Sequence, residues 1–519
     1  MRLSRAIFTE GVYESATLNV IGVALLFLSP GLLVCTLVEW GSGSSHQEMA
    51  LLGTTCLTLV IGMSLRTITS IADDSMEKPK AVFSVVAWSW VSCALVGVMP
   101  YLLGDVFAWS HFGNALFESI SGFSCTGSTV LEDIESNGRG ILLWRQMTQW
   151  YGGMGMIVLG VTVLPNLGVG GLKLMAAEAP GHKSDKLKAK SIDTAKSLWV
   201  IYFGITAVIT FALWILPNIS FYDAIAHGFS TVATGGFSTY NASIGHFNSY
   251  LAELVIVVGM FICAMNFNLQ FIFLRGQGEN KANRGKIKVF TDSSEWKLYV
   301  KITLLTVFGV FLLNWLLDSA PVGIAFRDSL FNVVALASST GFGNVRPNGI
   351  GDFVLWGTAT QLVLLFLMAV GGTVGSTSGG MKVLRMQIGL KALRRELKKL
   401  QHGKLVFPIK LGKTPVEDSI VASALGFISL FISFVIGGTL VATVCGGDDF
   451  VSSLSGAISA MSNMGPALGD AGPTSNFLEF SRTGRAALAV LMVVGRLEIY
   501  AVILMFIAPA DRLKIRKQT

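Results

Sequence analysis

Long apolar stretches alternate with short polar ones along most of the chain. A helix needs about 20 apolar residues to cross roughly 30 Å of hydrocarbon. The stretches that come near this length are residues 18–38, 49–65, 81–103, 141–164, 198–216, 251–274, 298–317, 354–370, 420–444 and 486–507. Four other apolar segments, 117–123, 224–232, 330–337 and 451–461, are too short to cross. The pattern predicts an all-α integral membrane protein with about ten transmembrane helices and four re-entrant helices.

One unit recurs four times from residue 81 onward: a long span, a short apolar segment, a glycine-centred polar stretch and a second long span. The polar stretches, which we call the glycine segments, are residues 124–128, 233–238, 338–343 and 462–466. We expect an N-terminal two-helix segment at 1–70, pore units at 81–165, 194–274, 296–395 and 416–509, and a basic tail at 510–519. Four such units suggest helix, pore-helix, helix repeats in a pseudo-fourfold arrangement.

The glycine segments predict a pore. Non-helical backbone at membrane depth is tolerated only where it is buried in protein or lines a water-filled path. Glycine allows carbonyl oxygens to point inward, and rings of carbonyls can replace the hydration shell of a cation such as K+. One Thr-Gly pair alone would more often be a turn, but four in register favour an ion filter. The residues that we expect to cap the short helices are Asn114, Asp223, Asp328 and Asp449.

Composition and charge exclude a soluble domain and give the chain an orientation. Hydrophobic residues make up 52% of the 519 residues and charged residues only 14%, against about 25% charged in an average soluble domain. The net charge is +7, and positive residues gather in cytoplasmic loops of membrane proteins, so nucleic-acid binding is not indicated. The basic connections include Lys183, Lys196, Arg275, Lys288, Lys301, Lys391, Arg394, Arg395, Lys398 and Lys399. Both termini are predicted to be cytoplasmic; the basic runs serve topology and lipid attraction, or a cytosolic partner docks on them.

Other chemistries have no support in the sequence. The six cysteines form no CxxC pair, and no histidine stands at metal-ligand spacing, so we expect neither a disulfide framework nor a transition-metal site. No phosphate-binding GxxxxGK[ST] loop and no dinucleotide fingerprint is present. Residues 1–16 lack a small-residue cleavage site after them and are predicted to belong to a retained first helix.

Four motifs, at residues 235–239, 371–383, 463–466 and 495–498, give the chain a family resemblance. With them the chain resembles the Trk, Ktr and HKT superfamily of potassium transporters, and the Trk branch most closely because two spans precede the four units. The resemblance implies a K+ filter at Cys125, Thr126, Gly127, Thr234, Gly235, Thr340, Gly341, Asn463, Met464 and Gly465. Glycine in all four filter positions looks like potassium selectivity, although Cys125 and Ser128 depart from the family's first filter segment.

The resemblance also implies a gate and partners. Residues 371–380 hold five glycines and four hydroxyl side chains inside a predicted span, which an ordinary helix in lipid cannot accommodate. By resemblance this stretch is a pore-blocking loop, formed by Gly371, Gly372, Gly375, Ser376, Thr377, Ser378, Gly379 and Gly380, with Arg496 as an electrostatic valve. A rigid helix break, and a salt bridge of Arg496 to another unit, are the alternatives; Glu498 is predicted to be structural. The implied assembly is a homodimer in the bacterial cytoplasmic membrane with a cytosolic ring of nucleotide-binding regulatory subunits.

The sequence thus predicts uptake of K+ without a bound cofactor, with Rb+ and Na+ as further candidate ions. A sodium- or proton-coupled potassium symporter is the first alternative, with Glu118, His227 and Glu498 as the few intramembrane candidates for a proton route. A membrane-embedded enzyme is a remote alternative because none of the six histidines lies in an evident catalytic motif.

Overall fold

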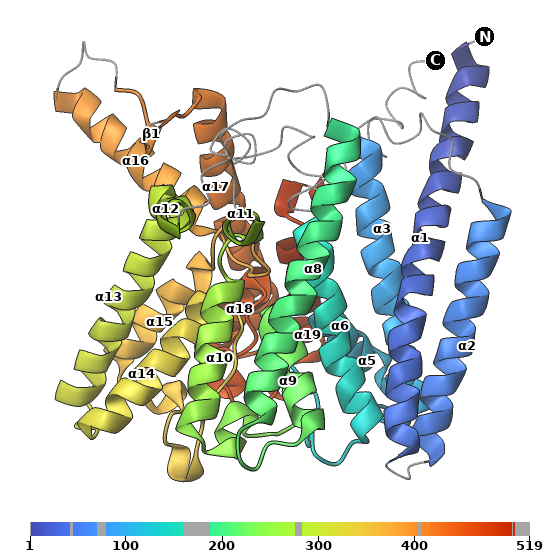
Figure 1. Cartoon of the computed structure of the whole chain (residues 1–519), viewed down its shortest axis with the longest axis horizontal. Coiled ribbons are helices and arrows are strands. Elements are labelled where there is room, and N and C mark those ends of the chain that lie inside the picture. The colour runs from blue at the N-terminus through green and yellow to red at the C-terminus, as the bar shows by residue number, and fades with distance from the viewer. Residues whose placement is uncertain are drawn as a thin grey trace.

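The part of the protein that the structure describes consists mostly of helices that run side by side (Figure 1). The computed structural model describes residues 2–41, 45–69, 79–158, 187–275, 283–401, 407–412, 414–500 and 502–503. The chain starts with a helical hairpin of α1 (Arg2–Trp40) and α2 (Ser45–Ile68) on one flank of the molecule. The predicted basic tail at 510–519, Lys183 and the ends of two predicted spans, 159–164 and 504–507, lie outside the described residues.

The remaining helices follow in four groups. The first holds α3 (Pro79–Gly97), α4 (Met99–Leu103), α5 (Phe112–Phe123) and α6 (Arg139–Val158). The second holds α8 (Leu187–Trp214), α9 (Phe221–Ala233), α10 (Tyr250–Cys263) and α11 (Phe267–Arg275). The third holds α12 (Asn283–Asp292), α13 (Ser294–Leu316), α14 (Val322–Ala337), α15 (Thr358–Val370) and α16 (Val383–Gln401). After the short antiparallel strands β1 (Lys410–Leu411) and β2 (Thr414–Pro415), the fourth holds α17 (Asp418–Leu440), α18 (Phe450–Ser462) and α19 (Arg482–Arg496).

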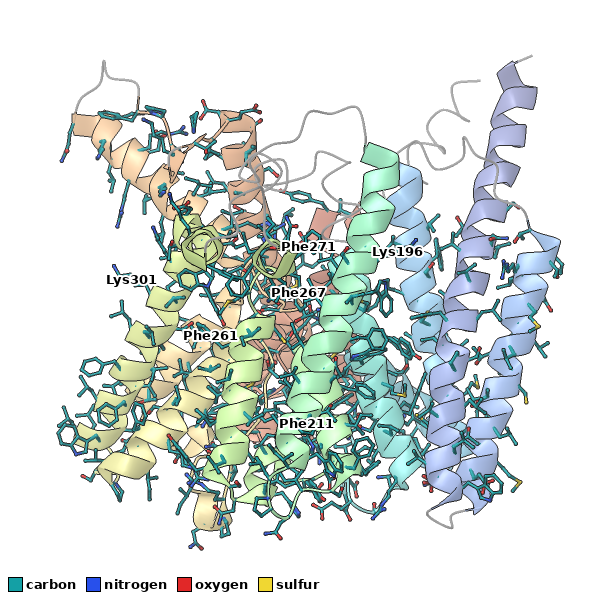
Figure 2. The ribbon with its side chains drawn as sticks, viewed as in Figure 1. Lys196, Phe211, Phe261, Phe267, Phe271 and Lys301 are labelled. Carbon is teal, nitrogen blue, oxygen red and sulfur yellow. The ribbon has the colours of Figure 1, made fainter. Side chains whose placement is uncertain are left out.

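Six of the described helices are long and apolar enough to cross a membrane. They are Thr17–Trp40, His46–Ile68, Val85–Leu103, Ala195–Trp214, Ser294–Leu316 and Asp418–Gly446, and the bent pair of α10 and α11 would make a seventh. Their outward faces carry exposed apolar side chains, such as Phe211 on α8, of which 59% is exposed (Figure 2). Large exposed apolar surfaces of this kind mark contact with lipid or with protein.

Two spans that the sequence predicted as continuous helices are broken in the structure, and this corrects the prediction. The span at 251–274 bends by 97° between α10 and α11. The carbonyl of Ala264 in this bend accepts from Thr373 instead, both from its amide at 3.0 Å and from its hydroxyl at 3.2 Å. The span at 486–507 stops at Arg496, and Glu498 takes the left-handed conformation with φ 64°. Hydropathy could not reveal either break because the breaking partners come from another part of the chain.

The helix caps were predicted correctly at only one of four positions. Asp449 caps α18, accepting from two first-turn amides at 2.9 and 3.1 Å. The residues that precede α5, α9 and α14 are His111, Ser220 and Pro321. Asn114, Asp223 and Asp328 therefore lie inside their helices. The two aspartates contact residues that follow the glycine segments instead.

Candidate ion pathway

The four glycine segments share one backbone conformation. Each short helix ends in a left-handed residue, and the following amide donates to the carbonyl five residues earlier, which is the Schellman arrangement. The left-handed residues are Cys125, Thr234, Ser339 and Asn463, with φ between 49° and 54°. The donors that follow are Thr126, Gly235, Thr340 and Met464, at 2.9, 2.9, 2.9 and 3.0 Å. The next residues, Gly127, Gly236, Gly341 and Gly465, have φ of 86°, 82°, 76° and 107°, a region that favours glycine.

This register corrects the predicted position of the second glycine. The sequence assigned Gly235 to the position of Gly127, but the structure aligns Gly235 with Thr126 and places Gly236 at the glycine position. Two adjacent glycines look equivalent in a sequence. The left-handed residue decides between them: Thr234 follows the last residue of α9 directly, whereas Cys125 lies two residues after the end of α5.

The four glycines bring the segments together in cyclic order. At each one, a Cβ atom would lie closer than 3.0 Å to a carbonyl oxygen of the next segment. The pairs are Gly127 with Gly235, Gly236 with Thr340, Gly341 with Met464, and Gly465 with Thr126. The fourth segment thus returns to the first, and the ring closes. No side chain larger than hydrogen fits at these positions without moving a neighbouring carbonyl.

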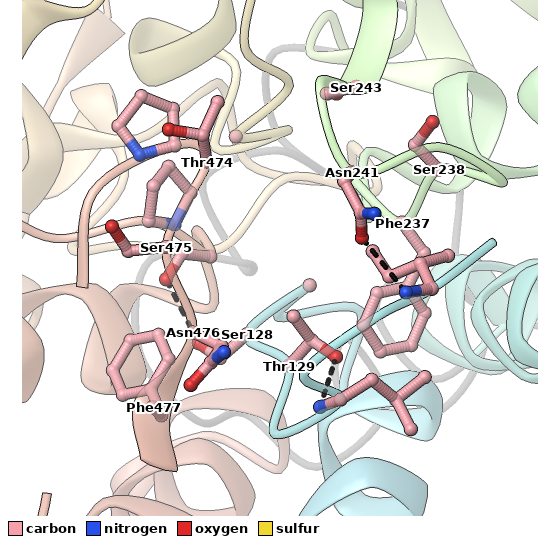
Figure 3. Close-up of a pocket in the computed structure, with 18 of the residues that line it drawn as sticks. Ser128, Thr129, Phe237, Ser238, Asn241, Ser243, Thr474, Ser475, Asn476 and Phe477 are labelled. Atoms are coloured by element: carbon pink, nitrogen blue, oxygen red, sulfur yellow. Dashed lines mark hydrogen bonds between the residues drawn. The ribbon is translucent and has the colours of Figure 1, made fainter. Parts of the chain in front are cut away.

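A polar cavity of about 290 Å³ opens on one side of this ring. It is lined by all four glycines of the ring, and Ser128, Phe237 and Thr474 face it from different loops (Figure 3). Helix α6 contacts the ring through Gln149, whose side-chain amide donates to the Gly235 carbonyl at 2.7 Å. Among the residues that the structure describes, no cluster of three or more His, Cys, Asp or Glu side chains could hold a metal ion.

A fully buried ion pair anchors the loop beyond the first glycine. Arg145 of α6 contacts Glu118 of α5, with Nε and Oε1 2.9 Å apart and neither side chain exposed. The other oxygen of Glu118 accepts from the Val130 amide at 2.9 Å, while Arg145 donates to the Ser238 carbonyl at 3.1 Å. The pair therefore joins the loop after the first glycine segment to the end of the second glycine segment. Glu118, which the sequence analysis considered as a candidate for a proton route, accepts hydrogen bonds from Arg145, Thr129 and the Val130 amide.

Asp223 and Asp328, which do not cap their helices, accept hydrogen bonds from residues that follow the glycine in the second and third groups. Asp223 of α9 accepts from the hydroxyls of Thr239 and Tyr240, both at 3.1 Å. Asp328 of α14 accepts from the amide side chain of Asn344 at 3.1 Å. In three groups a carboxylate on the short helix thus holds the chain that follows the glycine. Charge in an apolar segment is the sequence signal that could have identified these tethers.

The stretch that the sequence predicted as a gate is a buried loop between α15 and α16. It lies against the helix-side residues of the ring, opposite the 290 Å³ cavity. The Ser339 hydroxyl contacts that of Ser378 at 2.9 Å and accepts from the Gly379 amide at 2.6 Å. Ser378 in turn accepts from the Gly372 amide at 2.7 Å. The predicted loop residues are brought together: Gly371, Gly375 and Gly380 have φ of 71°, 76° and 80°, and Ser376 donates to the Thr373 carbonyl.

Arg496 lies where this loop, the ring and α6 meet. One Nη donates to the Thr377 carbonyl at 2.9 Å. The other Nη donates to the Gly152 carbonyl at 3.0 Å and to Cys125 Sγ at 3.1 Å. Only 2% of the side chain is exposed. Within the described ranges Arg496 takes part in no ion pair, so the salt-bridge alternative finds no partner there.

Glu498, two residues on, has a different partner. Its Oε2 lies 2.5 Å from an Nη of Arg385, whose guanidinium also stacks 3.9 Å from the Phe427 ring. This ion pair ties the first turn of α16 to the chain after α19. The structural role predicted for Glu498 agrees with this contact.

Comparisons with known proteins agree with this architecture. A family model described as TrkH, cation transport protein, matches residues 54–515. The chain is 34% identical over 433 residues to the Trk system potassium uptake protein TrkH of Salmonella typhimurium, covering 83% of this chain and 85% of the relative. It is 36% identical over 429 residues to the Halomonas elongata TrkH, covering 82% and 84%.

A solved structure gives the same answer. The crystal structure of the potassium transporter TrkH from Vibrio parahaemolyticus superposes with a TM-score of 0.83 at 30% sequence identity, covering 95% of this chain and 98% of that one. These matches confirm the resemblance to the Trk branch, and they exclude the remote enzyme alternative because the relatives are transport proteins. The chain is a multi-pass membrane protein and belongs to the TrkH family of potassium-transporting cation transport proteins.

Proposed function

We propose that the chain takes up K+ through a selectivity filter that its own four glycine segments form around one axis. The observation that carries this proposal is the cyclic contact of the four glycines with the carbonyls of the next segment. Carbonyl rings can replace a cation's hydration shell, and the C-terminal ends of four short helices add partial negative charge at the ring. The four helix groups then act as pseudo-fourfold pore units.

The loop between α15 and α16 acts as the gate, and Arg496 helps to hold it closed through its hydrogen bond to the Thr377 carbonyl. Its position on the helix side of the ring, where Ser339 and Arg496 both bond it, supports a closed pore in this conformation. A cation that has passed the ring meets the guanidinium of Arg496 in a buried setting, where electrostatic repulsion is strong. Opening requires that the loop move away from the ring.

Uptake follows the membrane potential without a coupled ion. Moving one charge through 100 mV is worth about 2.3 kcal/mol, enough to concentrate a cation about fiftyfold. The carboxylates and histidine that could carry protons are held by fixed partners: Glu118 by Arg145, Glu498 by Arg385, and His227 by Ser238 at 2.8 Å. These contacts favour uncoupled uptake over proton symport. K+ is the cargo, and no bound cofactor is required.

The end of the fold that holds the start of α1 and α16 faces the cytoplasm and binds a regulator. The start of α1 and the whole of α16 lie at one end (Figure 1), and Lys196 and Lys301 lie toward it (Figure 2). Basic residues mark the cytoplasmic side, here that of a bacterial cytoplasmic membrane. The exposed Arg394, Lys398 and Lys399 of α16 form a surface for a cytosolic nucleotide-binding ring, and a homodimer with one pore per protomer completes the assembly.

The deciding experiment is Rb+ and K+ uptake into proteoliposomes under an inside-negative potential, with sodium and pH gradients removed and a Na+ competition arm. Potential-driven uptake that Na+ inhibits weakly is expected. Uptake that appears only with a sodium or proton gradient would put the symporter in first place.

A further inference from the structure

An apolar groove separates the first and the fourth helix group on the outside of the fold. Its volume is about 780 Å³, and α3 and α5 form one wall while α17 and α19 form the other. Val91, Leu116 and Ile120 line the first wall, and Ala486, Ala489 and Val493 the second. Such a groove in a membrane protein is filled by lipid or by another protein.

Positive charge stands at one end of this groove. Arg482 and Arg485, in the first turn of α19, both line it. Arg485 uses one Nη for the Leu478 carbonyl at 2.8 Å. The carboxylate of Asp448, near the start of α19, is occupied by the Ser481 amide and hydroxyl at 2.8 and 3.1 Å. In the part of the chain that the structure describes, no ion pair includes either arginine.

The length of the groove fits one lipid in one leaflet. It follows α19 from Arg482 to Leu497, which is about 22 Å at a rise of 1.5 Å per residue. Half of a bilayer's hydrocarbon is about 15 Å thick, and a headgroup adds several ångström. Guanidinium groups hold phosphate oxygens through paired, charge-assisted hydrogen bonds. The groove therefore offers charge for a phosphate at one end and apolar walls for an acyl chain along the rest.

We propose that this groove binds one anionic phospholipid, with its phosphate at Arg482 and Arg485 and an acyl chain between α5 and α19. The inner end leads toward the pore: Leu116, Val493 and Leu497 also line a cavity of about 140 Å³ that Arg496 lines too. The Nε of Arg496 has no hydrogen-bond partner within the described chain. The acyl chain thus ends beside the arginine that contacts the loop.

The test is native mass spectrometry of the purified full chain, titrated with phosphatidylglycerol or with phosphatidylcholine of the same acyl chains. The double variant Arg482→Gln, Arg485→Gln removes the charge. The variant Gly113→Leu fills the groove, since Gly113 lines it and a Cβ there meets no atom within 4 Å. Arg139→Gln is the matched control because Arg139 is exposed and does not line the groove.

We expect the wild type and Arg139→Gln to bind phosphatidylglycerol at least tenfold more tightly than phosphatidylcholine. The double arginine variant should lose this preference, and Gly113→Leu should weaken both lipids. Equal affinity for the two lipids in the wild type, or an unchanged preference in the double variant, overturns the proposal. If Gly113→Leu leaves lipid binding intact but splits an oligomer, the groove holds a second copy of the chain instead. Transport is not measured, so the result is independent of the proposed function.

Discussion

The guanidinium of Arg496 donates to the carbonyl oxygen of Thr377 across 2.9 Å, which joins the end of α19 to the loop between α15 and α16. The same side chain reaches the Gly152 carbonyl at 3.0 Å. One buried cation thus bonds the loop and the helix that supports the first glycine segment. Charge-assisted hydrogen bonds are among the stronger ones in proteins. The arginine and the loop therefore have to be considered together.

Replacing Arg496 by alanine should raise basal K+ flux. The change removes both a positive charge below the ring and the bond to Thr377, and a hydrogen bond to a charged group contributes about 1.5–3 kcal/mol. We expect roughly a tenfold or greater increase in Rb+ uptake by proteoliposomes without added regulator. Arg394→Ala, which removes an exposed charge from α16, should leave basal uptake unchanged. A decrease in correctly folded Arg496→Ala protein would assign the residue a purely structural role.

Serine at the ring glycines should weaken discrimination between K+ and Na+. At Gly127 and Gly236 a side chain would displace a carbonyl of the next segment and would also adopt an unfavourable φ. Permeability ratios from Rb+ uptake with Na+ competition measure the effect. Gly204→Ser is the control, because a Cβ at Gly204 on α8 meets nothing within 4 Å. Unchanged ratios in both ring variants would contradict the filter proposal.

Much of the architecture could be predicted from the sequence because it depends on local composition. Apolar length predicted about ten spans, and six described helices, or seven with the bent pair, are long and apolar enough to cross a membrane. The recurring glycine segments identified backbone that leaves the helical conformation inside the protein. The breaks after Cys263 and at Arg496 could not be predicted in this way. At the first break, Thr373 and Thr377 take carbonyls that a continuous helix would use, and they lie more than a hundred residues away.

In the candidate site, too, some features follow from local composition and others depend on contacts between distant parts of the chain. The loop and the glycine segments follow from composition, whereas the choice between Gly235 and Gly236 depends on where α9 ends. The role of Arg145 also escaped prediction because its partners, Glu118 and Ser238, come from two different groups. Its charge inside a predicted span was a signal that could have been followed.

Removing the hydroxyl of Ser339 should loosen the loop. Ser339→Ala leaves the Gly379 amide without its acceptor and the Ser378 hydroxyl without its contact. A buried hydrogen bond of this kind contributes about 1 kcal/mol, so basal flux should rise roughly fivefold. Ser338→Ala is the matched control, since within the described chain its hydroxyl contacts the Ala335 carbonyl of α14 and the Thr340 hydroxyl rather than the loop. Equal flux in the two variants would show that the loop is held by other contacts.

The ion pair of Arg385 and Glu498 should stabilise the fold as a unit. The two side chains are 8% and 13% exposed, and removal of one partner leaves the other charge poorly solvated. Arg385→Met or Glu498→Met alone should therefore lower the free energy of unfolding by about 3 kcal/mol, which is measured as a lower midpoint of thermal unfolding. The double variant should lose less than the sum of the two single losses, because it leaves no unpaired charge. Measured on detergent-solubilised protein, additive losses would mean that the two groups are not coupled.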